Sequence, residues 1–184
     1  MSAKDILFLR MTYLRGPNIW TYRPVIEALI DIGELEDFPS NTLPGFNDRL
    51  KAWLPTMIEH RCTPGVRGGF FQRLDNGTWT GHILEHVSLE LQTLAGMPSG
   101  FGKAREAGPR GVYKVVVQTD HEEVGRATLE TARELILAAI HDTPFDVPAA
   151  VARLTDMVDS LCVGPSTASI AGRTVLFCSI AKTA

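Results

Sequence analysis

Residues 111–141, GVYKVVVQTDHEEVGRATLETARELILAAIH, decide the fold class of this chain. Positions 111–119 are rich in β-branched residues and alternate at their start, which predicts a strand. From Asp120 to His141 apolar residues recur every three or four positions, which predicts a long amphipathic helix. A strand followed at once by a long helix indicates a sheet that carries a helical layer.

The flanking segments add elements of both kinds without strict alternation. Strands are expected at 5–13 and 69–74, and helices at 46–58, 79–95 and 147–161. The run 25–32 fits either a strand or a short helix. Pro44 or Pro55 is expected to bend the first helix, and Gly96 to end the second. This order predicts one α+β domain, a small and mostly antiparallel sheet covered by helices.

Composition excludes several classes of protein. The chain has 184 residues, 45% of them hydrophobic, and 18 Lys and Arg stand against 21 Asp and Glu. This near balance leaves no excess of positive charge that would indicate binding to nucleic acid or to an anionic membrane. No apolar run is long enough to span a membrane, and the first residues are charged where a signal peptide would be apolar. The cysteines, Cys62, Cys162 and Cys178, are odd in number and far apart, so we expect a cytoplasmic protein.

The motif HILEH at 82–86 is the pattern that suggests chemistry. On a helix, His82 and His86 lie one turn apart and can direct both imidazoles at one point, as two ligands of a metal ion do. Glu85 is near enough to take a proton from water at that metal, as general base. Glu90 extends the polar stripe, and the apolar side should pack on the sheet. The alternative is a solvated helix face without metal.

A catalytic zinc needs a third protein ligand. The candidates in this chain are His60, Cys62, Glu90, His121, Glu122 and Glu123. HxxEH resembles the inverzincin signature of insulinase-type peptidases. That resemblance implies a glutamate on a downstream helix, so Glu123 is preferred and Glu122 comes second. The alternative for Glu123 is a capping box with Asp120 as the N-cap residue.

Two arginine-bearing loops flank the HxxEH helix. If they border one groove, Arg67, Arg73 and Arg105 can act as guanidinium forks for carboxylates, whereas the alternative is ordinary surface arginine. Neither GxGxxG nor GxxxxGK[ST] occurs at a helix start, so no ATP site is expected in this chain.

Several further motifs, in order, resemble the N-terminal domain of cyanophycin synthetases. They are LRGPNIW at 14–20, PSN at 39–41, RGGF at 67–70, GTWTGHILEH at 77–86, LAGM at 94–97 and GPST at 164–167. The resemblance implies that residues 1–163 form this domain. The resemblance also implies that residues 164–184 are the linker or tail that leads, in members of this family, into the ATP-grasp domain.

The resemblance also implies a function. These ligases polymerise aspartate and arginine into the storage polymer cyanophycin, using an ATP-grasp and a Mur-ligase-like domain that this chain is expected to lack. The N-terminal domain holds the polymer, and in some members it cuts polymer into primers. We therefore expect a zinc-dependent hydrolase of cyanophycin in which Glu90 meets substrate guanidinium groups. The alternative is a non-catalytic polymer-binding or assembly module of the synthetase, and a homo-oligomer is expected in either case.

Overall fold

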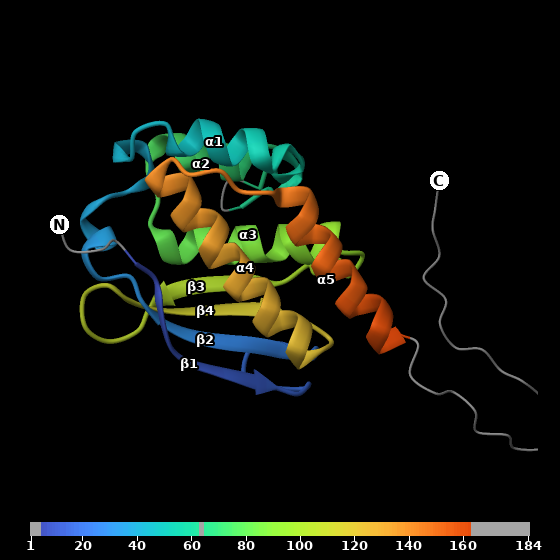
Figure 1. The fold of residues 1–184 in the computed structure, drawn as a ribbon. Helices are drawn as coiled ribbons and strands as arrows, with labels where there is room; N and C mark the ends of the chain where they lie inside the picture. Colours follow the sequence, from blue (N-terminus) through green and yellow to red (C-terminus); the bar gives the residue numbers. More distant parts are fainter. Residues whose placement is uncertain (1–4, 63–64, 163–184) are drawn as a thin grey trace, which may run out of the picture.

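The computed structural model describes residues 5–62 and 65–162. In this part of the chain four strands form one antiparallel sheet, and the helices lie on one of its faces (Figure 1). The sheet order is β1-β2-β4-β3. The strands are β1 Leu7–Leu14, β2 Val25–Asp31, β3 Gly102–Glu106 and β4 Val112–Gln118. The predicted α+β class with a small antiparallel sheet is confirmed, and 25–32 is resolved as a strand.

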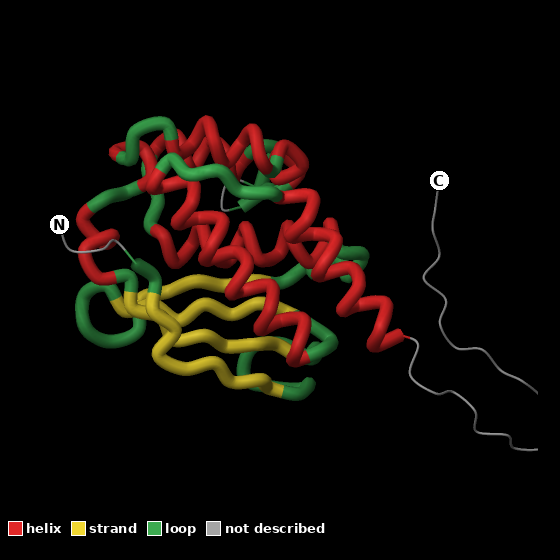
Figure 2. Tube along the Cα trace, viewed as in Figure 1, coloured by secondary structure: helices red, strands yellow, loops and turns green. Residues whose placement is uncertain are grey.

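The helical layer has two tiers, seen in Figure 2 as red coils above the yellow sheet. The α-helices are α1 Phe46–Trp53, α2 Gly69–Asn76, α3 Thr80–Leu94, α4 Glu122–His141 and α5 Val147–Cys162. The described residues also include three short 3-10 helices, η1 Gly33–Asp37, η2 Ser40–Thr42 and η3 Pro55–Glu59. In Figure 1, α3 and α4 lie nearest the sheet, with α1 and α2 above them.

Alternation along the central strands explains the core. Ile26 and Ile30 on β2 pair with Val117 and Tyr113 on β4, and all four side chains are buried. Successive strand residues point to opposite faces, so these residues present one apolar face to α3 and α4. The core therefore lies between the sheet and this helical pair.

Two predicted elements differ from the structure. Residues 69–74, expected as a strand, are helical in α2, because Phe70 and Leu74 lie four residues apart and both face the core. Residues 46–58 form α1 followed by η3, divided at Leu54 just before Pro55, as the proline suggested.

One strand was not predicted. The edge strand β3 was read as loop because it is short, begins with glycine and carries Lys103, Arg105 and Glu106. It pairs on one side only, with β4, and an edge strand tolerates such polar residues.

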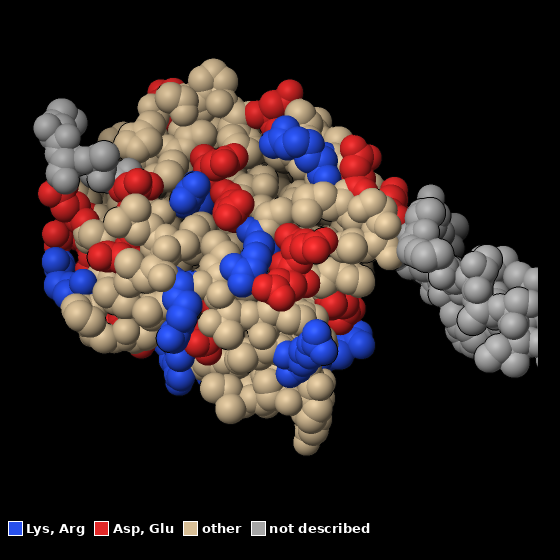
Figure 3. All heavy atoms as spheres, turned by 60° about the horizontal axis from the view of Figure 1, so that its bottom comes forward, with Lys and Arg blue, Asp and Glu red and all other residues tan. Residues whose placement is uncertain are grey.

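The surface carries charges of both signs. On the face that Figure 3 brings forward, Lys and Arg side chains intermingle with Asp and Glu, and neither sign dominates the view. Within 5–62 and 65–162, no helix is long and apolar enough to cross a membrane. The linker expected at 164–184 lies outside the described residues.

Candidate metal centre

The HxxEH helix is buried on both sides. One side packs on the sheet, and α4, α5 and η3 contact the rest of the helix. The exposed fractions of Glu85, His86 and Glu90 are 7%, 7% and 3%. The alternative of a solvated helix face therefore does not hold for these three residues. Leu94, expected in the core, is 38% exposed because it lies at the end of the helix.

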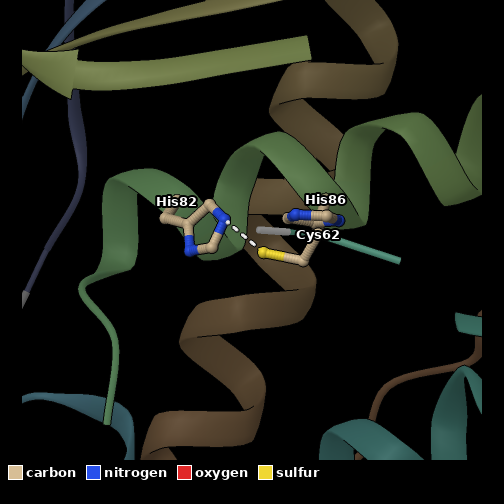
Figure 4. Close-up of side chains that lie close together, drawn as sticks. All are labelled: Cys62, His82 and His86. Atoms are coloured by element: carbon tan, nitrogen blue, oxygen red, sulfur yellow. Dashed lines mark hydrogen bonds between the residues drawn. The ribbon is translucent and has the colours of Figure 1, made fainter. Parts of the chain in front are cut away.

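Three side chains with donor atoms converge beside this helix. One ligand atom from each of Cys62, His82 and His86 lies within 4.8 Å of the other two. Figure 4 shows both histidines leaving α3 on the side where Cys62 approaches. The Cys62 Sγ atom is 3.4 Å from His82 Nε2. A single ion could therefore contact all three residues after small side-chain adjustments.

Glycines allow the segment that carries Cys62 to approach so closely. A Cβ atom at Gly69 would lie 1.8 Å from the backbone oxygen of Arg61, so no other residue fits there without displacing the chain. The Phe70 N–H donates to the His60 carbonyl at 3.1 Å, and the Gly68 N–H donates to the Ile58 carbonyl at 2.6 Å. The RGGF motif thus fixes the residues just before Cys62 against the start of α2.

Neighbouring side chains orient both histidines. Thr78 Oγ1 lies 2.8 Å from His82 Nδ1, and His60 Nδ1 lies 2.9 Å from His86 Nδ1. The Phe70 ring stacks on His86 with a centroid distance of 4.1 Å. Each imidazole therefore uses Nδ1 within the protein and has Nε2 left for a ligand.

Both histidines are held in the neutral form that binds metal. Burial lowers the pKa of His82 to about 4, and the nearby Arg73 guanidinium lowers it as well. Burial lowers the pKa of His86 to about 2, with further contributions from His82 and His60. At neutral pH both rings carry a lone pair and no charge.

The carboxyl group of Glu85 has a raised pKa. Burial raises the pKa of its carboxyl group to about 7, against a smaller opposing effect from a hydrogen bond with the Ala104 backbone. A pKa near the working pH suits proton transfer. A Cβ at Gly102 would lie 2.7 Å from Glu85 Oε1, so glycine at this position makes room for the carboxylate.

A pocket opens over these groups. Its volume is about 590 Å3, and its wall includes Cys62, His82, Glu85 and His86. Ser99 Oγ, also in the wall, is buried and has no hydrogen-bond partner among the described residues. It is available to a ligand.

A second hollow of about 330 Å3 adjoins this pocket, because both are lined by His82 and Ala104. Arg73 and Arg105 lie in its wall together with Glu106. Arg73 of α2 and Arg105 of β3, which were expected on loops, therefore border one hollow, and the Arg105 guanidinium lies over the Trp20 ring.

Other predicted site residues lie elsewhere. Glu122 and Glu123 are exposed at the start of α4, where His121 is the N-cap residue and makes no side-chain capping bond. The capping box with Asp120 is therefore wrong, and the group of possible ligands beside the two histidines contains Cys62 rather than Glu123. Arg67 is exposed and pairs with Glu59 at 2.7 Å.

Glu90 is also placed differently from expectation. Its carboxylate is buried and contacts Thr56 and His60, with 2.9 Å between Glu90 Oε2 and His60 Nε2. Neither pocket is lined by Glu90. Sequence reasoning did not identify Thr78 and Phe70 as part of the site, although both lie within motifs that it quoted.

The donor set fits zinc. One thiol and two imidazoles are ligands that zinc commonly takes, and three protein ligands leave one tetrahedral position for water or substrate. Cys62 and His82 alone could also form a thiol and base pair, but His86 brings a third donor to the same point. The fold and the site thus define a small α+β domain with a candidate three-residue metal centre.

Comparison with known proteins identifies the family. The family described as "Cyanophycin synthase-like N-terminal domain" matches residues 27–141. Cyanophycin synthetase of Crocosphaera subtropica is 41% identical over 167 residues, and that of Synechocystis sp. is 40% identical over the same length. Each alignment covers 88% of this chain and 19% of the relative. The chain belongs to the cyanophycin synthetase N-terminal domain family and spans about a fifth of the length of these relatives.

Proposed function

We propose that this domain binds cyanophycin and hydrolyses it at a zinc site, producing primers for polymer synthesis. The observation that carries the proposal is the convergence of Cys62, His82 and His86 beside Glu85 in one pocket. The choice of cyanophycin as substrate rests on the relatives, which are named cyanophycin synthetases.

The side chains suggest how hydrolysis would proceed. When bound by Cys62, His82 and His86, zinc supplies Lewis-acid chemistry, polarising a carbonyl group and making water more acidic. Glu85 accepts the proton of the attacking water and later delivers it to the leaving nitrogen of the cleaved amide. Its raised pKa suits both transfers. Ser99 Oγ is a hydrogen-bond donor within the same pocket.

The groove beside the metal centre supports polymer binding. Arg73 has no ion-pair partner in the described part of the chain, so its guanidinium group can receive a substrate carboxylate. The Arg105 guanidinium lies over the Trp20 ring, 4.6 Å from its centroid, and would have to leave this contact to do the same. Arg67 is the weakest of the three arginine candidates for binding carboxylates, because its guanidinium group already pairs with Glu59. Glu106 lines the adjoining hollow, so a carboxylate is present for a substrate guanidinium group.

A second candidate function is a polymer-binding or assembly module without catalysis. The arginine-lined hollow favours it, because this hollow does not need a metal to bind carboxylates. On either proposal the domain works with the ATP-grasp and Mur-ligase-like domains of a synthetase, as a homo-oligomer in the cytoplasm. The length of the relatives supports such partner domains.

Polymer cleavage tests the proposal. The purified chain is incubated with cyanophycin, and fragment lengths are followed with and without a chelator, with zinc restored afterwards. We expect cleavage that the chelator stops and zinc restores, and a loss of at least about a hundredfold in Glu85→Gln. Polymer binding without cleavage under all conditions would leave the binding module as the function.

A further inference from the structure

A series of hydrogen-bonded side chains, with Glu90 and His86 buried, connects the candidate metal centre to the surface at Thr56. It runs from Thr56 through Glu90 and His60 to His86. Glu90 and His86 are 3% and 7% exposed, and the His60 side chain is 16% exposed. The hydrolysis described above uses none of Thr56, His60 and Glu90 directly, so their arrangement needs its own explanation.

The chemistry of Glu90 determines which group donates and which accepts in each of these hydrogen bonds. A carboxylate only accepts hydrogen bonds. Thr56 Oγ1 therefore donates to one oxygen of Glu90, and His60 Nε2–H donates to the other at 2.9 Å. When His60 carries a single ring proton, the contact with Glu90 holds that proton on Nε2, and Nδ1 has only a lone pair.

The same logic fixes the proton on His86. His60 Nδ1 accepts, so His86 Nδ1–H must donate across their 2.9 Å separation. As a metal ligand, His86 carries one ring proton only, and this is the proton on Nδ1 that it shares with His60. Its second nitrogen, Nε2, then carries the lone pair that a metal requires.

We propose that Glu90 and His60 are positioning residues, which hold His86 in the Nδ1–H tautomer and so direct its Nε2 lone pair into the metal centre. Hydrogen-bond partners of this kind raise the basicity of a histidine ligand and fix its ring, and their loss costs about 10- to 100-fold in metal affinity. The stacked ring of Phe70 restrains the plane of the same imidazole. This inference rests on the proposed metal site and extends it to its supporting residues.

Glu90→Gln tests the direction of these hydrogen bonds. The side-chain amide keeps the shape of Glu90 but can also donate to His60 Nε2, which lets His60 donate from Nδ1 and leaves the proton of His86 on Nε2. We expect zinc affinity, measured by competition with a chromophoric chelator, to fall about 10- to 100-fold. Glu59→Gln is the matched control, because Glu59 lines the same pocket but is exposed and pairs with Arg67.

Nitrogen NMR of the histidine rings in the metal-free protein gives a second readout that requires no zinc and no variant. We expect His86 to carry its proton on Nδ1 in the wild type, and the Nε2–H form to appear in Glu90→Gln. A wild-type His86 protonated on Nε2 would overturn the proposal, as would equal zinc affinities in Glu90→Gln and Glu59→Gln. A wild type that binds no zinc would instead refute the proposed metal site, and the NMR result would still decide the tautomer.

Discussion

Cys62 is the residue on which the identity of the third donor depends. Its Sγ atom lies 3.4 Å from His82 Nε2, whereas Glu123 is exposed at the start of α4. We therefore expect Cys62→Ser to lower zinc affinity at least about a hundredfold, because it removes a thiolate ligand. Glu123→Gln should leave the affinity unchanged. Isothermal titration of zinc into both variants makes the comparison, and the reverse pattern would restore the glutamate ligand of insulinase-type sites.

Glu85 makes folding stability depend on pH. Its pKa is raised from 4.5 to about 7, so the folded protein disfavours the charged carboxylate. The folded state therefore holds a proton that the unfolded chain has lost between about pH 4.5 and pH 7. In metal-free protein, stability should fall across this window as pH rises, by up to about 3 kcal/mol from this group.

Glu85→Gln removes that ionisation and should flatten this part of the profile. Urea unfolding at about pH 5 and about pH 8, with chelator present, provides the measurement. Relative to wild type, the variant should gain stability at the higher pH. A variant with the wild-type pH dependence would mean that the carboxyl group does not titrate as its burial indicates.

At the scale of elements, the contact between β3 and α3 sets the geometry of the base. A Cβ at Gly102 would lie 2.7 Å from Glu85 Oε1 and 2.9 Å from Leu89 Cδ1. Gly102→Ala should therefore destabilise the fold by about 1 to 3 kcal/mol and displace the Glu85 carboxylate. Gly100→Ala is the control, because no atom lies within 4 Å of its added Cβ. Equal melting temperatures for the two variants would show that β3 moves away at little cost.

Prediction from sequence worked best where one pattern dominates an element. The strand β4 and the helices α3 and α4 follow from apolar periodicity, whereas the run that forms β2 fitted either a strand or a short helix. α2 was misread because its short apolar run suits either element, and tertiary contacts of Phe70 and Leu74 decide the outcome. The edge strand β3 was missed because it carries charge and little apolar signal.

The candidate site was predictable to the extent that it is local. His82, Glu85 and His86 lie within one helical turn, so spacing alone brought them together. Cys62 was a candidate, but its position depends on the contact between Gly69 and Arg61, which leaves no periodic signal. The buried role of Glu90 depends on η3 covering α3, a tertiary contact that a helical pattern does not reveal.

At the scale of the whole molecule, the groove joins the metal pocket to the arginine-lined hollow. Replacing Arg73 and Arg105 together with alanine should weaken binding of soluble cyanophycin fragments at least about tenfold. Arg67→Ala should have a much smaller effect, since that side chain pairs with Glu59 outside the hollow. Wild-type affinity should also fall as salt rises. Fluorescence anisotropy with labelled fragments measures all three, and affinity indifferent to the double substitution would place the polymer on another surface.

The zinc content of the purified protein tests the central claim most directly. Elemental analysis should find one zinc per chain in the wild type and almost none in His82→Ala, with circular dichroism showing that the variant remains folded. This result follows if the three donors beside Glu85 form a metal centre. Zinc well below one per chain in protein prepared with zinc present, or undiminished zinc in folded His82→Ala, would contradict the account.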